Sequence, residues 1–163
     1  MNGGSDNDRL YGNDGNDTIY GADGYDRLVG QDGNDELIGG SSSDRFFGGA
    51  GRDVMTGSGG RDGFSFVSAS DSAVGSQRDV ITDFDGRFDV INLRVIDANE
   101  NIGGNQVFDY IGGAGFSGTA GEVRIADLGA DVIVSGDTDG DGRADFEIMV
   151  LGTGTMEAND FLL

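Results

Sequence analysis

A nine-residue motif repeats without interruption near the start of the chain. Seven consecutive copies run from Gly3 to Ser65. Position one of every copy is glycine, position six is aspartate and position eight is apolar. A unit of nine residues cannot bury its apolar side chain alone, so neighbouring copies must stack and share one core. The repeat therefore predicts a solenoid.

Each copy divides into six turn residues rich in Gly, Asp and Asn, followed by a three-residue strand. Side chains alternate along a strand, so the position-eight side chain is expected to face inward and its neighbours outward. Two strands per coil predict an all-β fold, a flattened right-handed parallel β-roll that repeats every eighteen residues. Its apolar column consists of Leu10, Ile19, Leu28, Leu37, Phe46, Met55 and Phe64.

The position-six residues are Asp8, Asp17, Asp26, Asp35, Asp44, Asp53 and Asp62. In a roll, residues n and n+18 lie about 4.8 Å apart, so these carboxylates stack in two ladders. At that distance two unit charges repel by about 1 kcal/mol even at the dielectric constant of water. Oxygen atoms on opposite sides of a Ca²⁺ ion are separated by twice its bond length of about 2.3–2.6 Å, which matches the ladder. The spacing predicts calcium between stacked turns.

Each copy pairs with the next but one, which predicts about five calcium ions in the roll. Glycine at positions one and four is expected to adopt positive φ and to direct backbone carbonyls at the ions. At position four, Asp6 and Ser42 depart from glycine. The further predicted ligands, from positions one and three, are Gly3, Gly12, Asp14, Gly21, Asp23, Gly30, Asp32, Gly39, Ser41, Gly48 and Ala50. The alternative is a glycine-rich solenoid with solvated aspartates.

After residue 67 the glycine period stops and strand-like runs follow. We expect two domains, a calcium-binding roll over 3–67 and a C-terminal β-sandwich-like cap over 68–163, with a meander formed by the last three runs. The connector Ser68–Arg78 is expected to contain a helical turn. The predicted strands are Asp79–Phe84, Phe88–Val95, Gln106–Ile111, Val123–Ala126, Asp131–Ser135 and Asp145–Leu151.

Composition excludes several function classes. The 163 residues include 30 acidic and ten basic side chains, a net charge of −20, and no His, Cys or Lys. Histidine, cysteine and lysine catalysis and zinc sites built on imidazole or thiolate are therefore excluded. The charge disfavours nucleic acid and anionic membranes, and no apolar run is long enough to span a bilayer. We predict no catalytic residue, because turns explain the Asp-rich segments better than a carboxylate pair does.

Three further segments could carry a site. Asp79, Asp83 and Asp89 could complete a terminal ion site, or could be solvated acids at strand edges. Asp137, Asp139 and Asp141 open like an EF-hand loop, but position twelve is Ile148, so a tight hairpin turn and a calcium site are both open. The GxGxxG segment 113–118 precedes a predicted strand rather than a helix, so a dinucleotide site is rejected.

The seven copies resemble the GGxGxDxUx nonapeptide repeats of the RTX family. Segments of the second half resemble the C-terminal region of serralysin-type secreted metalloproteases: FSFVSASDS, DVITDFDGRFDVINL, FSGTAGEVRI, GDTDGDGRADFEIMVLGT and the terminal DFLL. The resemblance implies a calcium-folded module, secreted to the extracellular space by a bacterial type I machinery. It also implies an uncleaved C-terminal signal formed by Asp160, Phe161, Leu162 and Leu163. The zinc-binding HExxH helix of that family's catalytic domain cannot form here, because the chain has no histidine.

We therefore expect a non-catalytic module that folds when it binds calcium after export. Met1 and Asn2 directly precede the first repeat, which indicates the C-terminal part of a longer protein with an N-terminal catalytic domain. The alternative is a calcium-dependent adhesin or polysaccharide-binding module, as in mannuronan epimerases, whose nonapeptides are similar. The net charge would repel an acidic polysaccharide, although bound calcium could bridge the two. A surface-layer-like or calcium-buffering protein is a third hypothesis.

Overall fold

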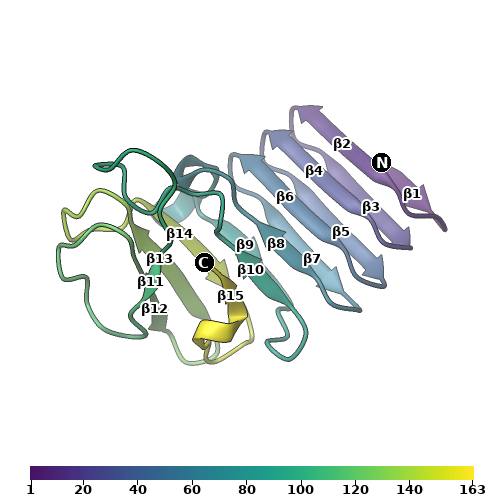
Figure 1. The fold of residues 1–163 in the computed structure, drawn as a ribbon. Coiled ribbons are helices and arrows are strands. Elements are labelled where there is room, and N and C mark those ends of the chain that lie inside the picture. Colours follow the sequence, from purple (N-terminus) through teal and green to yellow (C-terminus); the bar gives the residue numbers. More distant parts are fainter.

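The computed structural model describes all 163 residues, and its strands form two sheets. The two sheets flank a common core, and successive repeats add strands to them in turn (Figure 1). The first sheet contains, in spatial order, β1 (Asn2–Gly4), β3 (Thr18–Asp23), β5 (Glu36–Ser41), β7 (Val54–Ser58), β9 (Asp79–Ile81), β14 (Phe146–Val150), β13 (Val132–Asp137), β12 (Glu122–Asp127) and β11 (Asp109–Tyr110). The second contains β15 (Phe161–Leu162), β10 (Val90–Asn92), β8 (Gly63–Ser65), β6 (Arg45–Ala50), β4 (Arg27–Asp32) and β2 (Arg9–Asp14).

The repeats form the predicted parallel β-roll. Odd and even copies supply alternate sheets, and equivalent residues eighteen apart pair in parallel register, as in Leu10 with Leu28 and Ile19 with Leu37. All seven position-eight side chains are buried, and the rings of Phe46 and Phe64 stack 4.9 Å apart. The inward column predicted from the sequence is confirmed.

The strands of the roll are longer than the three residues predicted. β2 to β6 each contain six residues, because the pairing runs on into the following turn. Asn13 pairs with Gln31 and Asp14 with Asp32, which are positions two and three of the next copies. Stacked turns with the same backbone conformation keep their register, so the ladder of hydrogen bonds does not stop at position nine.

The roll does not stop with the seventh repeat. β9 pairs in parallel with β7, and β10 pairs in parallel with β8. Ile81 lies beside Met55 and Ile91 beside Phe64, so both isoleucines extend the buried column. Both sheets therefore continue across residues 67 and 68, the boundary that the repeat pattern predicts.

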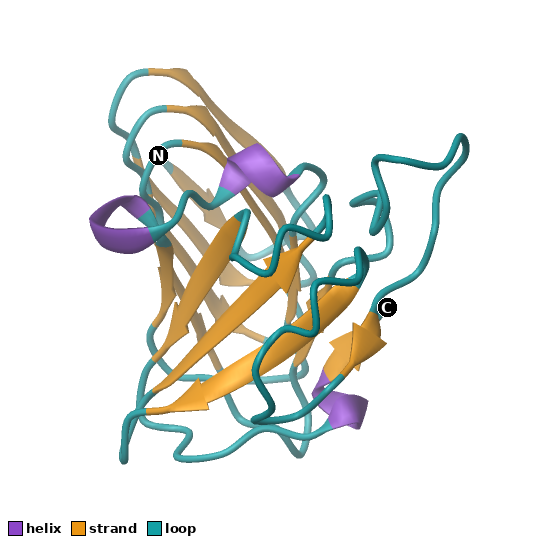
Figure 2. Cartoon of the chain, turned by 90° about the vertical axis from the view of Figure 1, so that its left-hand side faces the viewer, coloured by secondary structure: helices purple, strands orange, loops and turns teal.

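The C-terminal half completes both sheets. β12, β13 and β14 form the predicted antiparallel meander, and β14 pairs in parallel with β9, which joins the meander to the roll (Figure 2). The connector contains two short 3-10 helices, η1 (Ala69–Asp71) and η2 (Gly75–Gln77). A third, η3 (Ala158–Asp160), precedes β15, a strand that sequence analysis missed. None of the helices has the length and hydrophobicity needed to cross a lipid bilayer.

Candidate metal centre

The position-six aspartates form two continuous ladders. From Asp26 to Asp62, the carboxylate Oδ1 of each accepts a hydrogen bond from the backbone N–H of the aspartate eighteen residues earlier, as from Asp17 to Asp35 at 2.8 Å. The same 2.8 Å bond joins the other aspartates of the repeats that are eighteen residues apart. From Asp26 to Asp62 these side chains are at most 3% exposed. The turns therefore hold a row of carboxylates out of water.

The second oxygen of most of these carboxylates has no hydrogen-bond partner. The buried and unpaired Oδ2 atoms belong to Asp8, Asp26, Asp35, Asp44, Asp53 and Asp79. A buried anionic oxygen without a partner is unfavourable, so each Oδ2 favours a cation beside it. Hard divalent cations prefer oxygen ligands of this kind.

The position-one glycines lie against these oxygens. A methyl group on Gly12 would lie 2.9 Å from Asp17 Oδ2 and 2.7 Å from the carbonyl oxygen of Gly30 on the next coil. The glycines with both an aspartate Oδ2 and a carbonyl of the next coil beside them are Gly3, Gly12, Gly21, Gly30 and Gly39. Only glycine leaves this space open, so a carboxylate oxygen and a carbonyl oxygen of successive coils converge there. This arrangement of donors fits Ca²⁺.

The expectation that position-one glycines adopt positive φ is wrong. Positive φ occurs instead at position two, in glycine and also in Asn13, Ala22, Gln31 and Ser58, and at position four from Gly15 onward. Position one needs glycine for the close approach of neighbouring oxygens, not for its backbone conformation. At position four the prediction is confirmed except at Asp6, and Ser42 keeps the positive φ without being glycine.

The predicted position-three ligands lie at the exposed ends of the strands. The carbonyls of Asp32 and Ala50 accept hydrogen bonds from Gly15 and Gly33 of the preceding coil. Their side chains are exposed, in contrast to the buried position-six carboxylates. The full position-three set is Asp14, Asp23, Asp32, Ser41 and Ala50.

Two aspartates beyond the repeats extend the ladders. Asp79 accepts from the backbone N–H of Asp53 at 2.8 Å, and Asp89 accepts from that of Asp62 at 2.9 Å. The residues after them, in DVIT and DVIN, repeat the D-x-U-x end of the nonapeptide, which is the sequence signal for these positions. Asp83 differs: it is exposed, and it accepts from the N–H groups of Gly57 and Ser58 at the end of β7.

Burial disfavours charge on the ladder. Burial raises the pKa of Asp44 and of Asp53 to about 6, from an ordinary value of 3.8, and the neighbouring carboxylates act in the same direction. The same causes raise the pKa of Asp62 to about 7 and that of Asp79 to about 8. Burial therefore shifts these carboxylates toward the protonated form unless a cation takes the place of the proton.

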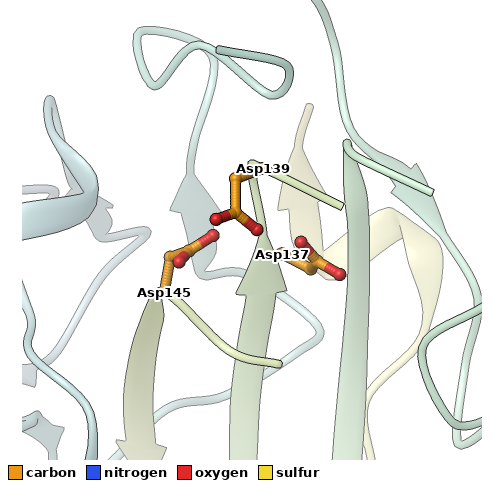
Figure 3. A group of neighbouring side chains, drawn as sticks. All are labelled: Asp137, Asp139 and Asp145. Carbon is orange, nitrogen blue, oxygen red and sulfur yellow. The ribbon is translucent and has the colours of Figure 1, made fainter. Parts of the chain in front are cut away.

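A separate acidic cluster lies in the loop between β13 and β14. Carboxylate oxygens of Asp137, Asp139 and Asp145 lie within 4.8 Å of one another (Figure 3). Asp145 was missed because it lies beyond the DxDxDG motif, and the hairpin brings it back beside Asp139. Asp141, which the motif included, is not in the cluster, because its carboxylate accepts from the N–H of Arg143.

Hydrogen bonds within the loop satisfy most of this cluster. Asp137 is fully buried and accepts from the N–H groups of Gly140 at 2.6 Å and Gly142 at 2.9 Å. Asp145 accepts from the N–H and hydroxyl of Thr138 at 2.6 and 2.8 Å. These bonds hold the tight hairpin turn without an ion.

The predicted secretion signal is part of the fold. β15 pairs in parallel with β10, so Phe161 lies beside Ile91. Phe161 is buried, and its ring packs 5.4 Å from that of Tyr110. Asp160 is also buried and accepts from the N–H of Glu157 at 2.7 Å, while Leu163 packs against the core.

Comparison with known proteins identifies the repeats. The family model of the RTX calcium-binding nonapeptide repeat matches residues 1–28 and 29–64. Residues 1–64 are RTX calcium-binding nonapeptide repeats. RTX repeats bind Ca²⁺, are typical of secreted proteins and form calcium-binding rather than catalytic modules. All seven position-six aspartates, from Asp8 to Asp62, lie within the matched segment.

Two solved structures are similar to the whole chain. The AlgE6R3 subunit of the Azotobacter vinelandii mannuronan C5-epimerase is 28% identical with a TM-score of 0.45, over 98% of this chain and 80% of that subunit. The AlgE6R2 subunit of the same epimerase is 28% identical with a TM-score of 0.47, over 97% of this chain and 88% of that subunit. No curated protein matches the chain.

Proposed function

We propose that the chain is a calcium-dependent folding module of a secreted protein. Calcium ions between stacked turns displace protons from the ladder aspartates and neutralise the repulsion between their carboxylates. The observation that carries this proposal is the row of buried, unpaired Oδ2 atoms. Five of them face a position-one glycine, and at four of these glycines, Gly3, Gly21, Gly30 and Gly39, a carbonyl of the next coil completes the pair of oxygens. About five ions then occupy the roll, and Asp79 and Asp89 extend the ladders for one or two more.

Calcium binding and folding are linked in this proposal, because the stacked turns exist only in the folded chain. A site contributes about 4 kcal/mol to stability when calcium is a thousandfold above its dissociation constant. Five divalent ions would cancel half of the net charge of −20. At low calcium the chain stays expanded and able to pass through a type I channel, and outside the cell calcium folds it.

The remaining assignments complete the proposal. Residues 3–67 bind calcium, and residues 68–163 cap the roll and carry the export signal at Asp160–Leu163. The N-terminal partner is a catalytic domain of a secreted hydrolase, as in the serralysin-type metalloproteases that the second half resembles. The chain itself supplies no catalytic residue.

Calorimetric calcium titration of the Asp35→Asn variant tests the proposal. Asp35 belongs to two stacked pairs, with Asp17 and with Asp53. Asparagine keeps an oxygen for the N–H of Asp17 but removes the charge, so we expect one or two fewer bound ions and a roughly tenfold higher calcium midpoint. The control is Asp109→Asn, which removes the same charge from an exposed side chain on β11. Equal titrations for both variants would refute the ladder as the binding site.

A further inference from the structure

A groove of roughly 900 Å³ crosses the six-stranded sheet. Its lining extends from β2 at the N-terminal end of the roll to β10 and β15, along the row of strands in Figure 1. Four arginines line it: Arg9, Arg27, Arg45 and Arg61. They are four of only ten basic side chains in the chain, so positive charge is concentrated on this face.

Three of these arginines form a regular row. Arg9, Arg27 and Arg45 occupy position seven of alternate copies and pair in register on β2, β4 and β6. Their backbones are therefore about 4.8 Å apart, one strand spacing. Position seven points away from the core, because position eight is buried. Three like charges at this spacing repel one another, so the row favours an anionic partner with repeated charges.

The four arginines are free of ion pairs although the chain has 30 acidic residues. The ion pairs of the molecule involve Arg78, Arg87 and Arg143 instead. The guanidinium of Arg27 lies 4.0 Å from the centre of the Phe47 ring, and its Nε is buried without a hydrogen-bond partner. Stacking fixes the orientation of the planar group, and no acceptor of the protein engages its N–H groups.

The groove also contains aromatic surface and the edge of an aspartate ladder. Tyr25 is 64% exposed and lines the groove, as Phe47 also does. Flat aromatic faces of this kind suit the apolar faces of sugar rings. The ladder residues in the lining are Asp8, Asp26, Asp44 and Asp62.

We propose that this groove binds an acidic oligosaccharide with one carboxylate per sugar, and that it does so when calcium is bound. The inference rests on the proposed function, because bound calcium neutralises the aspartates in the lining. The arginines then give the groove a net positive charge. A guanidinium binds a carboxylate through two parallel hydrogen bonds, which a row of arginines can repeat along a chain of uronic acids. Nucleic acid suits the groove less, because its denser charge is repelled more strongly by the rest of the acidic surface.

The test measures binding of hexagalacturonate, which is too short to form a calcium gel, by calorimetry in millimolar calcium. The variant Arg9→Gln/Arg27→Gln/Arg45→Gln removes the row. The control Arg87→Gln/Arg94→Gln/Arg143→Gln makes the same charge change at three exposed arginines outside the groove. We expect binding to the wild type, at least about 30-fold weaker binding to the row variant, and a change below about threefold in the control. A circular dichroism calcium titration of each protein confirms that it folds.

The outcomes separate the two proposals. Folding on calcium without hexagalacturonate binding overturns the groove and leaves the calcium proposal intact. Equal loss in the row variant and the control also overturns it, because only general charge would then matter. Tighter binding of poly-glutamate or single-stranded DNA than of hexagalacturonate assigns the groove to another polyanion and refutes the sugar. A chain that neither binds calcium nor changes fold refutes the proposed function, whatever the sugar does.

Discussion

At the scale of single residues, the position-one glycine decides whether a turn can hold an ion. A methyl group on Gly30 would meet Asp35 Oδ2 and the carbonyl of Gly48, the two oxygens assigned to calcium. We expect Gly30→Ala to lower the free energy of unfolding in calcium by about 1–3 kcal/mol and to raise the calcium midpoint. Thermal unfolding of Gly113→Ala is the control, because no atom lies within 4 Å of that position. Equal stability of the two variants would contradict this role.

The ladder carboxylates also predict how stability depends on pH. Without calcium, the folded-state pKa of Asp62 is about 7 and that of Asp79 is about 8, above the ordinary 3.8 of an unfolded chain. A raised folded-state pKa means that the folded chain binds protons more tightly. This stability is present below the unfolded pKa and is lost as pH rises through 6 to 8. In EDTA we therefore expect more folded protein at pH 5 than at pH 8, measured by circular dichroism.

Calcium should reverse this dependence. Bound calcium needs ionised carboxylates, so acidification from pH 7 to pH 5 should release ions and lower the melting temperature in calcium. A melting temperature in EDTA that rises between pH 5 and pH 8 would contradict the assignment of buried, protonated carboxylates to the metal-free fold.

At the scale of elements, one buried hydroxyl bridges the start of β9 and the neighbouring strand β14 of the meander. Ser72 is fully buried; its Oγ donates to the carbonyl of Glu147 and accepts from the N–H of Asp79 at 2.8 Å. Removing the hydroxyl leaves two buried backbone groups unpaired. We expect Ser72→Ala to lower the free energy of unfolding by about 1–3 kcal/mol, measured by urea denaturation in calcium. The exposed Ser76→Ala should change it by less than about 0.5 kcal/mol.

The sequence predicts some elements of the fold and of the site better than others. Repeats of constant length fix which side chains stack, so the roll, its inward column and its aspartate ladders followed from the sequence. Asp79 and Asp89 were expected only as possible ligands of a terminal ion site. Their places in the two ladders did not follow from the period, because they lie 26 and 27 residues beyond their partners and the inserted segments break the repeat of eighteen. The contact of Asp139 with Asp145 depends on the hairpin, which the motif spacing does not encode.

At the scale of the whole molecule, the C-terminus is folded into the six-stranded sheet. Phe161 is buried beside Ile91, so the terminal residues are accessible only when the sheet opens. We expect carboxypeptidase to remove Phe161–Leu163 quickly in EDTA and at least about tenfold more slowly in calcium, as followed by mass spectrometry. Equal rates in both conditions would show that calcium does not fold this end of the chain.

The central claim is that calcium folds the chain, and far-UV circular dichroism during a calcium titration tests it most directly. The titration starts in EDTA at pH 7.5 and passes through millimolar calcium, with magnesium as the control. The account predicts a coil-to-β transition with calcium, about five ions bound by parallel calorimetry, and little response to magnesium. A chain that already has its full β-signal in EDTA, and does not change with calcium, would contradict the account.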